Sequence, residues 1–563
     1  MGEAAIVNAG EAVADYLANI GVTVAFGVIS VHNLPILDAI ARQARIRFVP
    51  ARGEAGAYNM ADAYARRTGR LGVAITSTGG GAGNAAGAQM EALAAGSPVL
   101  HLTSNVDRSF LDRDCGPIHD VGGQMAMLTA ISKSTFRVWE GRRATTTLDA
   151  AVRGALSAPT GPVTVEIPID VQYEASNNPF VRSPAIARTV PLESDLDALA
   201  ARVRRARRPI IWTGGGARDA CTQASELVQR GFVAVTSMNG RGVVPETMPG
   251  TLGAFQATPS SEAIYARSDL LLVVGSRLRA METRNGGLRL PASIVQIDVD
   301  PKCAAANYAI EMFVHGDARL VLEGLLARLP ATLDVDPAFA GSASEAHLAS
   351  QRELAATLGP YRAIADALRG VVGPGRHPFV RDVTIASATF GNRYVTVAEP
   401  RLSVHAAAGG IGQSLAMGIG AALAEKGPKT IVLAGDGGAI LSIGELATAV
   451  QEQAELAIVL MNDGGYGIIR NLQDAQFAGR QHYASLHTPD FEALCRGFGV
   501  GYQKVGRSED FSGALQNAIA AAGPQMVEVD MKAVGAFAIP FSGTTPKPVS
   551  GAIAGDAANS RIG

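Results

Sequence analysis

The sequence has few of the features that mark disulfide-bonded, zinc-stabilised or nucleic-acid-binding proteins. Its 563 residues include only four cysteines, none in a CxxC pair: Cys115, Cys221, Cys303 and Cys495. This spacing argues against a disulfide framework and against a structural zinc site. Basic and acidic side chains nearly balance, 49 against 51, so we expect no binding to nucleic acid or to an anionic membrane.

Targeting and membrane-spanning patterns are also missing. Residues 1–17 carry acids and lack the basic stretch and apolar core of a signal peptide. Apolar runs such as Asp269–Gly275 are far shorter than the ~20 residues that a membrane span needs. We therefore expect a cytoplasmic protein without a membrane partner.

What the chain does contain is a regular alternation of short β-branched runs and alanine-rich stretches. Continuous apolar strands separated by helices are typical of βαβ units and parallel sheets. We predict an α/β fold of three consecutive domains with parallel, helix-flanked sheets. The predicted domains span residues 1–175, 190–330 and 360–535, followed by a mobile tail at 536–563. Ala175–Arg188 and Pro337–Leu354 have the composition of linkers, the second one leading into a helix.

The strongest local signal is a pair of glycine-rich turns, GDGG and NDGG, that each place an aspartate after a predicted strand. Asp436 follows Ile431–Gly435, and Asp463 follows Ala457–Asn462, with a predicted helix between the two strands. A right-handed crossover brings both strand ends to one sheet edge, where open α/β sheets bind ligands. Small turn residues let backbone amides approach an anion, and carboxylates hold a hard cation. The pattern predicts a Mg²⁺-bridged diphosphate site; the plain alternative is two tight turns.

This stretch resembles the cofactor signature of thiamine-diphosphate (ThDP) enzymes. In that family the aspartate of a GDG turn, a later Asn side chain and a backbone carbonyl two residues on bind Mg²⁺. The resemblance gives these roles to Asp436, Asp463 and Gly465. It assigns cofactor binding in this stretch to Gly435, Asp436, Gly437, Gly438, Gly465 and Tyr466. Asp463 replaces the usual Asn, and its added negative charge leads us to expect stronger dependence on the divalent ion.

Two further stretches extend the resemblance. Glu54 opens a predicted helix at the place where ThDP enzymes carry a glutamate that hydrogen-bonds N1′ of the aminopyrimidine and promotes loss of the C2 proton. The preceding histidine of the family is Gly53 here. In Ala406–Ala422, the Gly409 carbonyl matches the acceptor for the 4′-amino group, and Ile411 matches the apolar wedge that bends ThDP. The plain alternatives are a first-turn acid stabilised by the helix dipole, and a small-residue helix packed on a sheet.

The resemblance covers nearly the whole chain and points to the acetolactate synthase and benzaldehyde lyase branch, which Gly161–Gln172 resembles in particular. In this family two cofactor-binding domains face each other across a subunit interface. Glu54 is therefore expected to serve the Mg²⁺ site of a partner subunit, which makes a homodimer the minimum and a homotetramer the usual assembly.

Residues that face the substrate should come from loops of the first domain. His32 and Gln124 match an active-site histidine and glutamine of benzaldehyde lyase, and His119 lies close enough in sequence to Gln124 to face the same cavity. A histidine with a near-neutral pKa can move protons to and from a developing alkoxide. The plain alternative for each is a polar loop or capping residue. Arg470 has two interpretations, a ligand for a carboxylate or phosphate and a surface arginine.

The resemblance implies a carboligase or lyase that acts on 2-oxo acids, 2-hydroxy ketones or aldehydes. Pyruvate decarboxylases use an adjacent His–His pair and a glutamate where this chain has Ile469, and no such pair occurs here. The alternatives are a 2-oxo-acid decarboxylase, a cyclic 1,2-diketone hydrolase, a 2-hydroxyacyl-CoA lyase, or a non-catalytic regulatory or scaffold subunit. Bound FAD stays open: Thr213–Ala217 (TGGGA) follows a predicted strand and could approach a nucleotide, but a lone glycine-rich turn does not decide the question.

Overall fold

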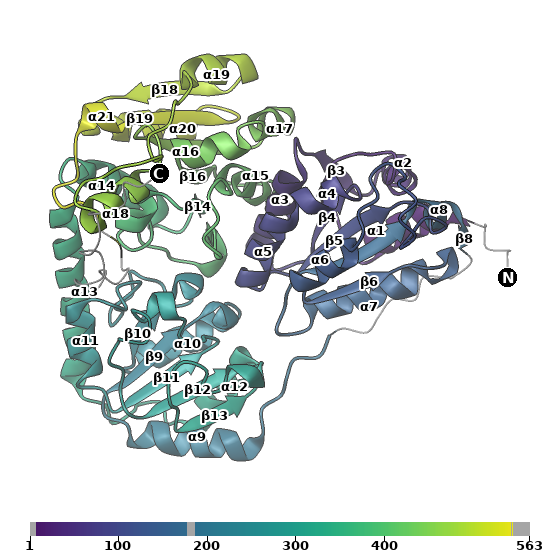
Figure 1. The fold of residues 1–563 in the computed structure, drawn as a ribbon. Helices are drawn as coiled ribbons and strands as arrows, with labels where there is room; N and C mark the ends of the chain where they lie inside the picture. Colours follow the sequence, from purple (N-terminus) through teal and green to yellow (C-terminus); the bar gives the residue numbers. More distant parts are fainter. Residues whose placement is uncertain (1–6, 177–185, 542, 544–563) are drawn as a thin grey trace, which may run out of the picture.

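The chain folds into three α/β units, each built on one parallel sheet with helices on its faces (Figure 1). This computed structural model describes residues 7–176, 186–541 and 543. The predicted α/β class with parallel, helix-flanked sheets is confirmed. A short antiparallel ribbon of β1 (Val7–Asn8) and β8 (Ala175–Ser176) joins the two ends of the first unit.

The first domain holds a six-stranded sheet in the order β3-β2-β4-β5-β7-β6. All residues of β4, β5 and β7 are buried, because helices cover both faces. Its strands are β2 (Val24–Gly27), β3 (Arg47–Pro50), β4 (Gly72–Thr76), β5 (Val99–Asn105), β6 (Ser134–Arg137) and β7 (Val163–Pro168). Its helices are α1 (Ala9–Asn19), α2 (Leu34–Gln43), α3 (Glu54–Thr68), α4 (Gly80–Asn84), α5 (Ala86–Ala95), α6 (Gln124–Ala130), α7 (Ala144–Leu156) and α8 (Ile169–Tyr173).

The central domain holds a five-stranded sheet in the order β10-β9-β11-β12-β13. β9 pairs with β10 on one side and with β11 on the other. The strand order therefore reverses between β9 and β11, and the loops after these two strands lie at the switch point of the sheet. Its strands are β9 (Pro209–Thr213), β10 (Val233–Thr236), β11 (Leu270–Val274), β12 (Ile294–Asp298) and β13 (Met312–His315). Its helices are α9 (Glu193–Arg205), α10 (Cys221–Gln229), α11 (Pro259–Tyr265) and α12 (Ala318–Arg328).

The third domain repeats the six-stranded plan in the order β15-β14-β16-β17-β19-β18. Its strands are β14 (Phe379–Arg381), β15 (Ser403–His405), β16 (Thr430–Gly435), β17 (Leu456–Asn462), β18 (Gly501–Val505) and β19 (Gln525–Asp530). Its helices are α14 (Tyr361–Val372), α15 (Ser414–Ala424), α16 (Asp436–Ala439), α17 (Glu445–Gln451), α18 (Gly467–Gln476), α19 (Phe491–Phe498), α20 (Phe511–Ala520) and α21 (Met531–Val534).

The first and third domains share one hydrophobic core, in which α3 packs against α15 (Figure 1). The two backbones touch at Gly420, where an added Cβ would lie 2.1 Å from the carbonyl oxygen of Met60. Only glycine allows so close an approach. The contact fixes the helix that begins at Glu54 against the helix that follows the loop carrying Ile411.

The structure corrects one predicted linker. Pro337–Thr357 is a single helix of 21 residues (α13), not an irregular connection leading into a helix. Asp336 caps it by accepting a hydrogen bond from the backbone amide of Ala338, and Pro337 occupies the first turn. The alanines of this segment favour a helix despite its three serines and one glycine, and Phe339 anchors the helix in the central core.

The predicted tail and linker fall partly outside the described residues. Of residues 536–563, only 536–541 and 543 are described, and there Phe537 stacks on Tyr361 with ring centroids 4.1 Å apart. Residues 177–185 of the first predicted linker also lie outside the described part. Mobility of the tail therefore stays a prediction.

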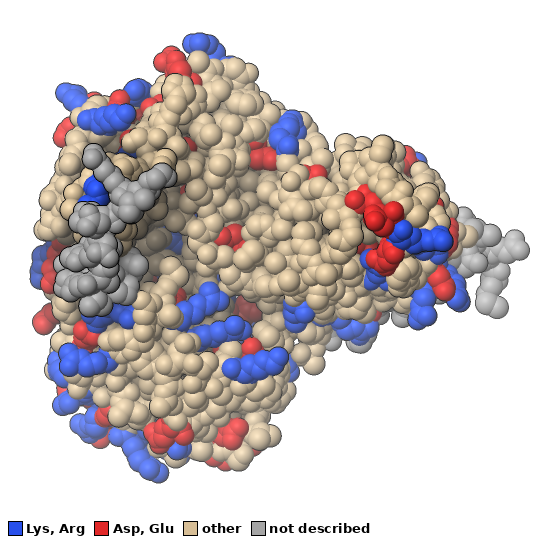
Figure 2. Space-filling model, in the orientation of Figure 1, with Lys and Arg blue, Asp and Glu red and all other residues tan. Residues whose placement is uncertain are grey.

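The surface agrees with the near-zero net charge. On the face shown in Figure 2, basic and acidic side chains are scattered over all three domains. Within the described residues, no helix is both long and apolar enough to cross a membrane. The cytoplasmic location stays a prediction.

Candidate active site

The two predicted carboxylates meet at the carboxyl edge of the third sheet. β16 and β17 are parallel neighbours, and the backbone amide of Asp463 donates a 3.2 Å hydrogen bond to Oδ1 of Asp436. Asp436 is 1% exposed, and its buried Oδ2 has no hydrogen-bond partner among the residues that the structure describes. Burial and then the nearby Asp463 charge raise the pKa of Asp436. Burying a carboxylate oxygen without a hydrogen-bond partner is costly, so this oxygen is a candidate ligand for a group that the described residues do not supply.

Asp463 is held by Arg470, which lies in the first half of α18. The guanidinium Nη2 lies 2.9 Å from Oδ2 of Asp463 and donates to its backbone oxygen at 3.0 Å. Nη1 donates to the carbonyls of Gly464 at 3.4 Å and Ala484 at 3.3 Å. Burial raises the pKa of Asp463, while Arg470 opposes that rise. Arg470 is therefore not a free surface arginine. It binds a carboxylate, and that carboxylate is the side chain of Asp463.

Glycines let three backbone segments converge around the carboxylates. An added Cβ on Gly437 would lie 2.8 Å from the ring of Tyr466 and 2.9 Å from the Gly465 carbonyl oxygen. An added Cβ on Gly412 would lie 2.9 Å from the carbonyl oxygen of Gly438. The turn after β16, the turn after β17 and the loop before α15 therefore form one cradle, which brings together the residues that the sequence assigned to cofactor binding.

The loop that carries Gly409 and Ile411 is fixed from two sides. Glu91 of α5 accepts hydrogen bonds from the backbone amides of Ala408 and Gly410, each at 2.7 Å. Asp382 accepts from the Gly412 amide at 3.0 Å and from the hydroxyl of Ser414 at 2.8 Å. Gly409 has a φ of +91°, which glycine adopts readily, and the side chain of Ile411 remains 36% exposed.

Glu54 stands at the start of α3 with its backbone position set by the third domain. The buried carboxylate of Glu445 accepts hydrogen bonds at 3.1 Å from the amides of Arg52 and Gly53, directly before Glu54. The half-buried Glu54 carboxylate itself accepts from Asn84 at 3.2 Å. An added Cβ on Gly81 would lie 2.9 Å from its Oε1. Glu54 thus lies over α4 of its own domain.

His32 and His119 lie together at the loops of the first domain. Their rings form an edge-to-face pair with centroids 5.3 Å apart. His32 is half-buried, and its Nδ1 has no hydrogen-bond partner in residues 7–176, 186–541 and 543; His119 is exposed and has a φ of +72°. Burial and then the neighbouring His119 lower the pKa of His32, so its imidazole is neutral at pH 7 and can accept a proton.

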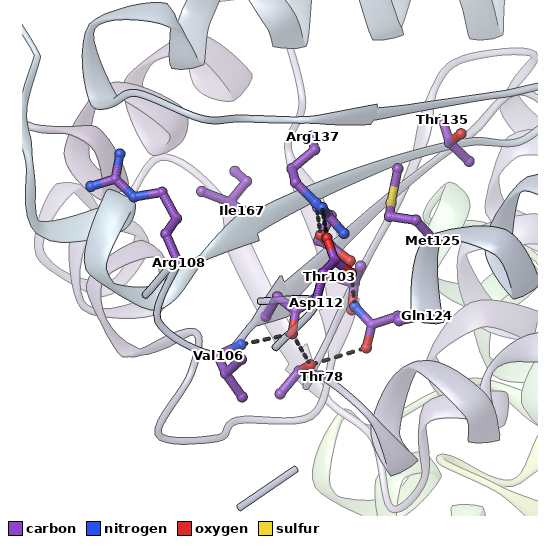
Figure 3. A network of polar contacts seen from close by, with 12 residues as sticks. Thr78, Thr103, Val106, Arg108, Asp112, Gln124, Met125, Thr135, Arg137 and Ile167 are labelled. Carbon is purple, nitrogen blue, oxygen red and sulfur yellow. Dashed lines mark hydrogen bonds and ion pairs between the residues drawn. The ribbon is translucent and has the colours of Figure 1, made fainter. Parts of the chain in front are cut away.

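Gln124 belongs to a buried polar network and is only 3% exposed (Figure 3). Its Oε1 accepts from the hydroxyl of Thr78 at 3.0 Å and from the Gly79 amide at 2.6 Å. Its Nε2 donates to the Ser104 carbonyl at 3.0 Å and to Glu166 at 2.8 Å. Both ends of the amide are therefore engaged with the protein, and a direct role for Gln124 on substrate stays a prediction that this placement does not favour.

The assigned residues form two groups in one chain. The third domain gathers Gly409, Ile411, Asp436, Asp463 and their glycine neighbours, whereas the first domain carries Glu54, His32, His119 and Gln124. The sequence did not point to three carboxylates that hold site segments. Glu91 and Asp382 hold the loop that carries Gly409 and Ile411, and Glu445 holds the segment directly before Glu54. A glutamate inside the apolar helix Ala86–Ala95 was a usable signal for Glu91, because a buried acid needs partners.

Comparison with known families gives three matches that follow the domain order. Residues 7–128 match the N-terminal TPP binding domain of thiamine pyrophosphate enzymes, where thiamine pyrophosphate (TPP) is another name for ThDP. Residues 196–325 match the central domain of these enzymes. Residues 385–529 match their C-terminal TPP binding domain.

Similar proteins span nearly the full length of the chain. A probable 2-ketoarginine decarboxylase of Pseudomonas aeruginosa is 30% identical over 534 residues, covering 93% of this chain and 94% of that protein. Acetolactate synthase isozyme 1 large subunit of Escherichia coli is 27% identical over 541 residues, covering 93% and 94%. An acetolactate synthase of Mycobacterium bovis is 28% identical over 536 residues, covering 90% and 85%.

Proposed function

The chain belongs to the thiamine pyrophosphate enzyme family, and from this premise we propose that it uses ThDP and Mg²⁺ to make or break carbon–carbon bonds beside a carbonyl group. Its substrates are 2-oxo acids or 2-hydroxy ketones, with an aldehyde or a second carbonyl compound as acceptor. The observation that carries the proposal is the buried Oδ2 of Asp436, which has no partner within the described part of the chain and lies beside a second carboxylate at the sheet edge.

The residues present fit a magnesium ion bridged to a diphosphate. Mg²⁺ takes oxygen ligands and is commonly held by one or two carboxylates together with substrate phosphates. Asp436 and Asp463 would supply carboxylates, and Gly465 a backbone carbonyl. Within the cradle, Gly435, Gly437 and Gly438 of the turn after β16 would leave room for the diphosphate, and Tyr466 would lie beside it.

Bound ThDP supplies a nucleophilic carbon that adds to carbonyl groups and an electron sink for the cleaved bond. The chain's own residues prepare that chemistry. Glu54 would hold a proton at N1′ of the pyrimidine, on a backbone position that Glu445 fixes. The Gly409 carbonyl would accept from the 4′-amino group, and Ile411 would set the bend between the two rings. Neutral His32 would take up or return a proton at the substrate oxygen, with His119 beside it.

A 2-oxo-acid decarboxylase is the second candidate, and the likeness to the probable 2-ketoarginine decarboxylase favours it. The two candidates share binding and cleavage steps and differ in the final step, which is either ligation to a second carbonyl compound or protonation and release of an aldehyde. The cyclic-diketone hydrolase and hydroxyacyl-CoA lyase alternatives gain no particular support from these relatives.

One experiment separates the candidates. Purified protein with ThDP and Mg²⁺ receives ¹³C-labelled pyruvate or 2-ketoarginine, each with and without benzaldehyde, and products are followed by NMR. A mixed 2-hydroxy ketone or acetolactate supports the carboligase. Free aldehyde as the sole product supports the decarboxylase. Protein that binds ThDP but leaves both 2-oxo acids unchanged would overturn the proposed donor class, and cyclic diketones, acyloins and acyl-CoA compounds would be tested next.

We further propose that the active site is completed by a second copy of the chain, in a homodimer or in a homotetramer of such pairs. Exposed apolar side chains flank the first-domain site residues, with Val31 65% exposed beside His32 and Ile118 80% exposed beside His119. Exposed apolar clusters of this kind are typical of interfaces between subunits.

A complementation test checks this arrangement. Glu54→Gln and Asp436→Ala proteins, each inactive alone, are mixed, dissociated and reassembled. If Glu54 serves the Asp436 site of its partner, random pairing restores roughly a quarter of wild-type activity, since half the dimers are mixed and carry one intact site of two. Mixtures that stay inactive although mixed dimers form would show that both residues act within one chain. Mass photometry gives the assembly size.

A flavin on the central domain is the cofactor that the proposal leaves open. The loops after β9 and β11 meet at the switch point of the sheet, where the Gly216 amide donates to the Gly275 carbonyl at 3.0 Å. An added Cβ on Gly214 would lie 2.1 Å from that carbonyl oxygen. Packing between the two loops thus accounts for these glycines without a nucleotide. A visible absorption spectrum of the purified protein decides whether FAD is bound.

A further inference from the structure

We propose that Arg470 neutralises Asp463, so that the Asp463–Arg470 ion pair takes the place of the uncharged amide that ThDP enzymes usually have at the metal site. The inference rests on the Mg²⁺ and ThDP site of the proposed function. It assigns Arg470 a positioning role: Arg470 acts on the metal through Asp463.

The geometry shows a built contact. Oδ2 of Asp463 and Nη2 of Arg470 are 2.9 Å apart, and the two side chains are only 15% and 18% exposed. An ion pair at this depth is screened much less than a surface pair. Arg470 lies one helical turn after Tyr466, whose carbonyl accepts the Arg470 amide at 3.1 Å. The cation is thus carried by the same segment as the turn after β17.

The charge balance explains why this chain needs the pair. An aspartate in place of asparagine adds one negative charge next to Asp436, the second carboxylate of the site. That charge would attract a divalent cation more strongly and repel the diphosphate. Arg470 adds one positive charge and returns the site to the net charge of an Asp–Asn pair. The stronger dependence on the divalent ion that Asp463 alone led us to expect is therefore offset.

Arg470 also anchors the backbone of the turn after β17, and this anchoring must be distinguished from its charge-balancing role. Its guanidinium donates to three carbonyls, those of Asp463, Gly464 and Ala484. A residue that only anchored this turn would weaken metal binding when removed, whatever residue 463 were. If Arg470 instead balances charge, its removal should strengthen Mg²⁺ binding when residue 463 is aspartate and should not do so when residue 463 is asparagine.

A double-mutant cycle with a lysine variant distinguishes these roles. Mg²⁺ is titrated by calorimetry into protein saturated with ThDP, for the wild type, Arg470→Gln, Asp463→Asn, the double variant and Arg470→Lys. Arg480→Gln, an exposed arginine in the loop after α18, is the matched control. Thermal unfolding of every variant checks that it is folded.

We expect opposite shifts from the two single substitutions. Arg470→Gln lowers the Mg²⁺ dissociation constant by about threefold to tenfold, because Asp463 is then uncompensated. Asp463→Asn raises it by about tenfold, because a ligand charge is lost and Arg470 is left unpaired beside the cation. The double variant returns to within about threefold of the wild type, and Arg470→Lys stays near the wild type because it keeps the charge.

Three results would overturn the inference. Arg470→Gln could leave Mg²⁺ affinity unchanged or weaken it, the double variant could bind Mg²⁺ as poorly as Asp463→Asn, or Arg470→Lys could behave like Arg470→Gln. Each points to backbone anchoring alone or to no role. Wild-type protein that binds no ThDP in the presence of Mg²⁺ would instead overturn the proposed function, and this inference with it.

Discussion

The carboxylate of Glu91 accepts a hydrogen bond from the backbone amide of Gly410 at 2.7 Å, so a side chain of the first domain shapes a loop of the third. Its other oxygen binds the Ala408 amide at the same distance. Glu91 is 1% exposed, and these two bonds satisfy a carboxylate that would otherwise be costly to bury. Docking of the two domains therefore adds to the bonds from Asp382 that fix the loop carrying Ile411.

Replacement of Glu91 by glutamine should disrupt this loop. A glutamine keeps one acceptor oxygen but turns an NH₂ group toward the second backbone amide, so one charge-assisted bond is lost and two donors face each other. We expect ThDP affinity at fixed Mg²⁺ to fall by about tenfold or more, since bonds to charged groups contribute about 1.5–3 kcal/mol. Calorimetric ThDP titration measures this. Glu353→Gln, on the exposed face of α13, is the control, and equal affinities for both variants would show that Glu91 does not order the loop.

Replacement of Glu54 by glutamine should abolish proton transfer and keep the fold. The Asn84 contact involves one carboxylate oxygen, which glutamine retains. We expect kcat to fall by about 10²–10⁴-fold, the usual contribution of a general acid–base, with little change in unfolding temperature. Steady-state kinetics and thermal unfolding measure the two quantities, with the exposed Glu345→Gln as reference. A loss below tenfold would reassign Glu54 to the plain role of a first-turn acid.

Gln124 offers a test between a buried network and a substrate contact. Gln124→Glu places a second carboxylate beside Glu166 and removes the donor to the Ser104 carbonyl. Leaving a buried acceptor unpaired costs about 1–3 kcal/mol, which corresponds to a fall of roughly 2–12 °C in the unfolding temperature of a domain of this size. Gln516→Glu, on an exposed face of α20, should leave that temperature unchanged. Unchanged unfolding with a raised KM would indicate that Gln124 faces the substrate instead.

The His32–His119 pair predicts a directed pKa change. Burial is the larger cause that lowers the pKa of His32, and His119 is the second. His119→Gln removes the second cause, so the pKa of His32 should rise yet remain below the ordinary value of 6.5. NMR titration of ¹³C-labelled histidine, assigned with a His32→Asn variant, measures it. His315→Gln, on β13 of the central domain, is the control, and an unchanged His32 pKa in His119→Gln would show that the two rings do not interact electrostatically.

The sequence predicts those parts of the structure that depend on residues close together in the chain. Apolar strands bounded by glycine indicate the three parallel sheets, and two Asp–Gly turns after neighbouring strands indicate the carboxylate pair. The wrong prediction at Pro337–Thr357 has a local cause as well, because three serines and one glycine gave a capped, alanine-rich helix the composition of a linker.

The contacts that set the active-site loops span the chain and leave no local pattern. Glu91 and Gly410 are 319 positions apart, and Glu445 and Gly53 are 392 positions apart. Each carboxylate finds its amides only after two domains have docked. Gln124 shows the converse: its position in the sequence suggested a catalytic residue. Both ends of its amide are engaged by the loop after β4, by β5 and by β7, which only the folded sheet brings together around it.

The contact between Gly420 and Met60 has a consequence for protein engineering. With α3 and α15 touching backbone to backbone, any side chain at position 420 would push the two helices apart and move the start of α3 away from the loop before α15. A chimera that takes its first domain from one relative and its third from another must therefore keep a glycine at position 420. Libraries aimed at new substrates should vary the exposed loops around His32 and His119 and leave this helix pair intact.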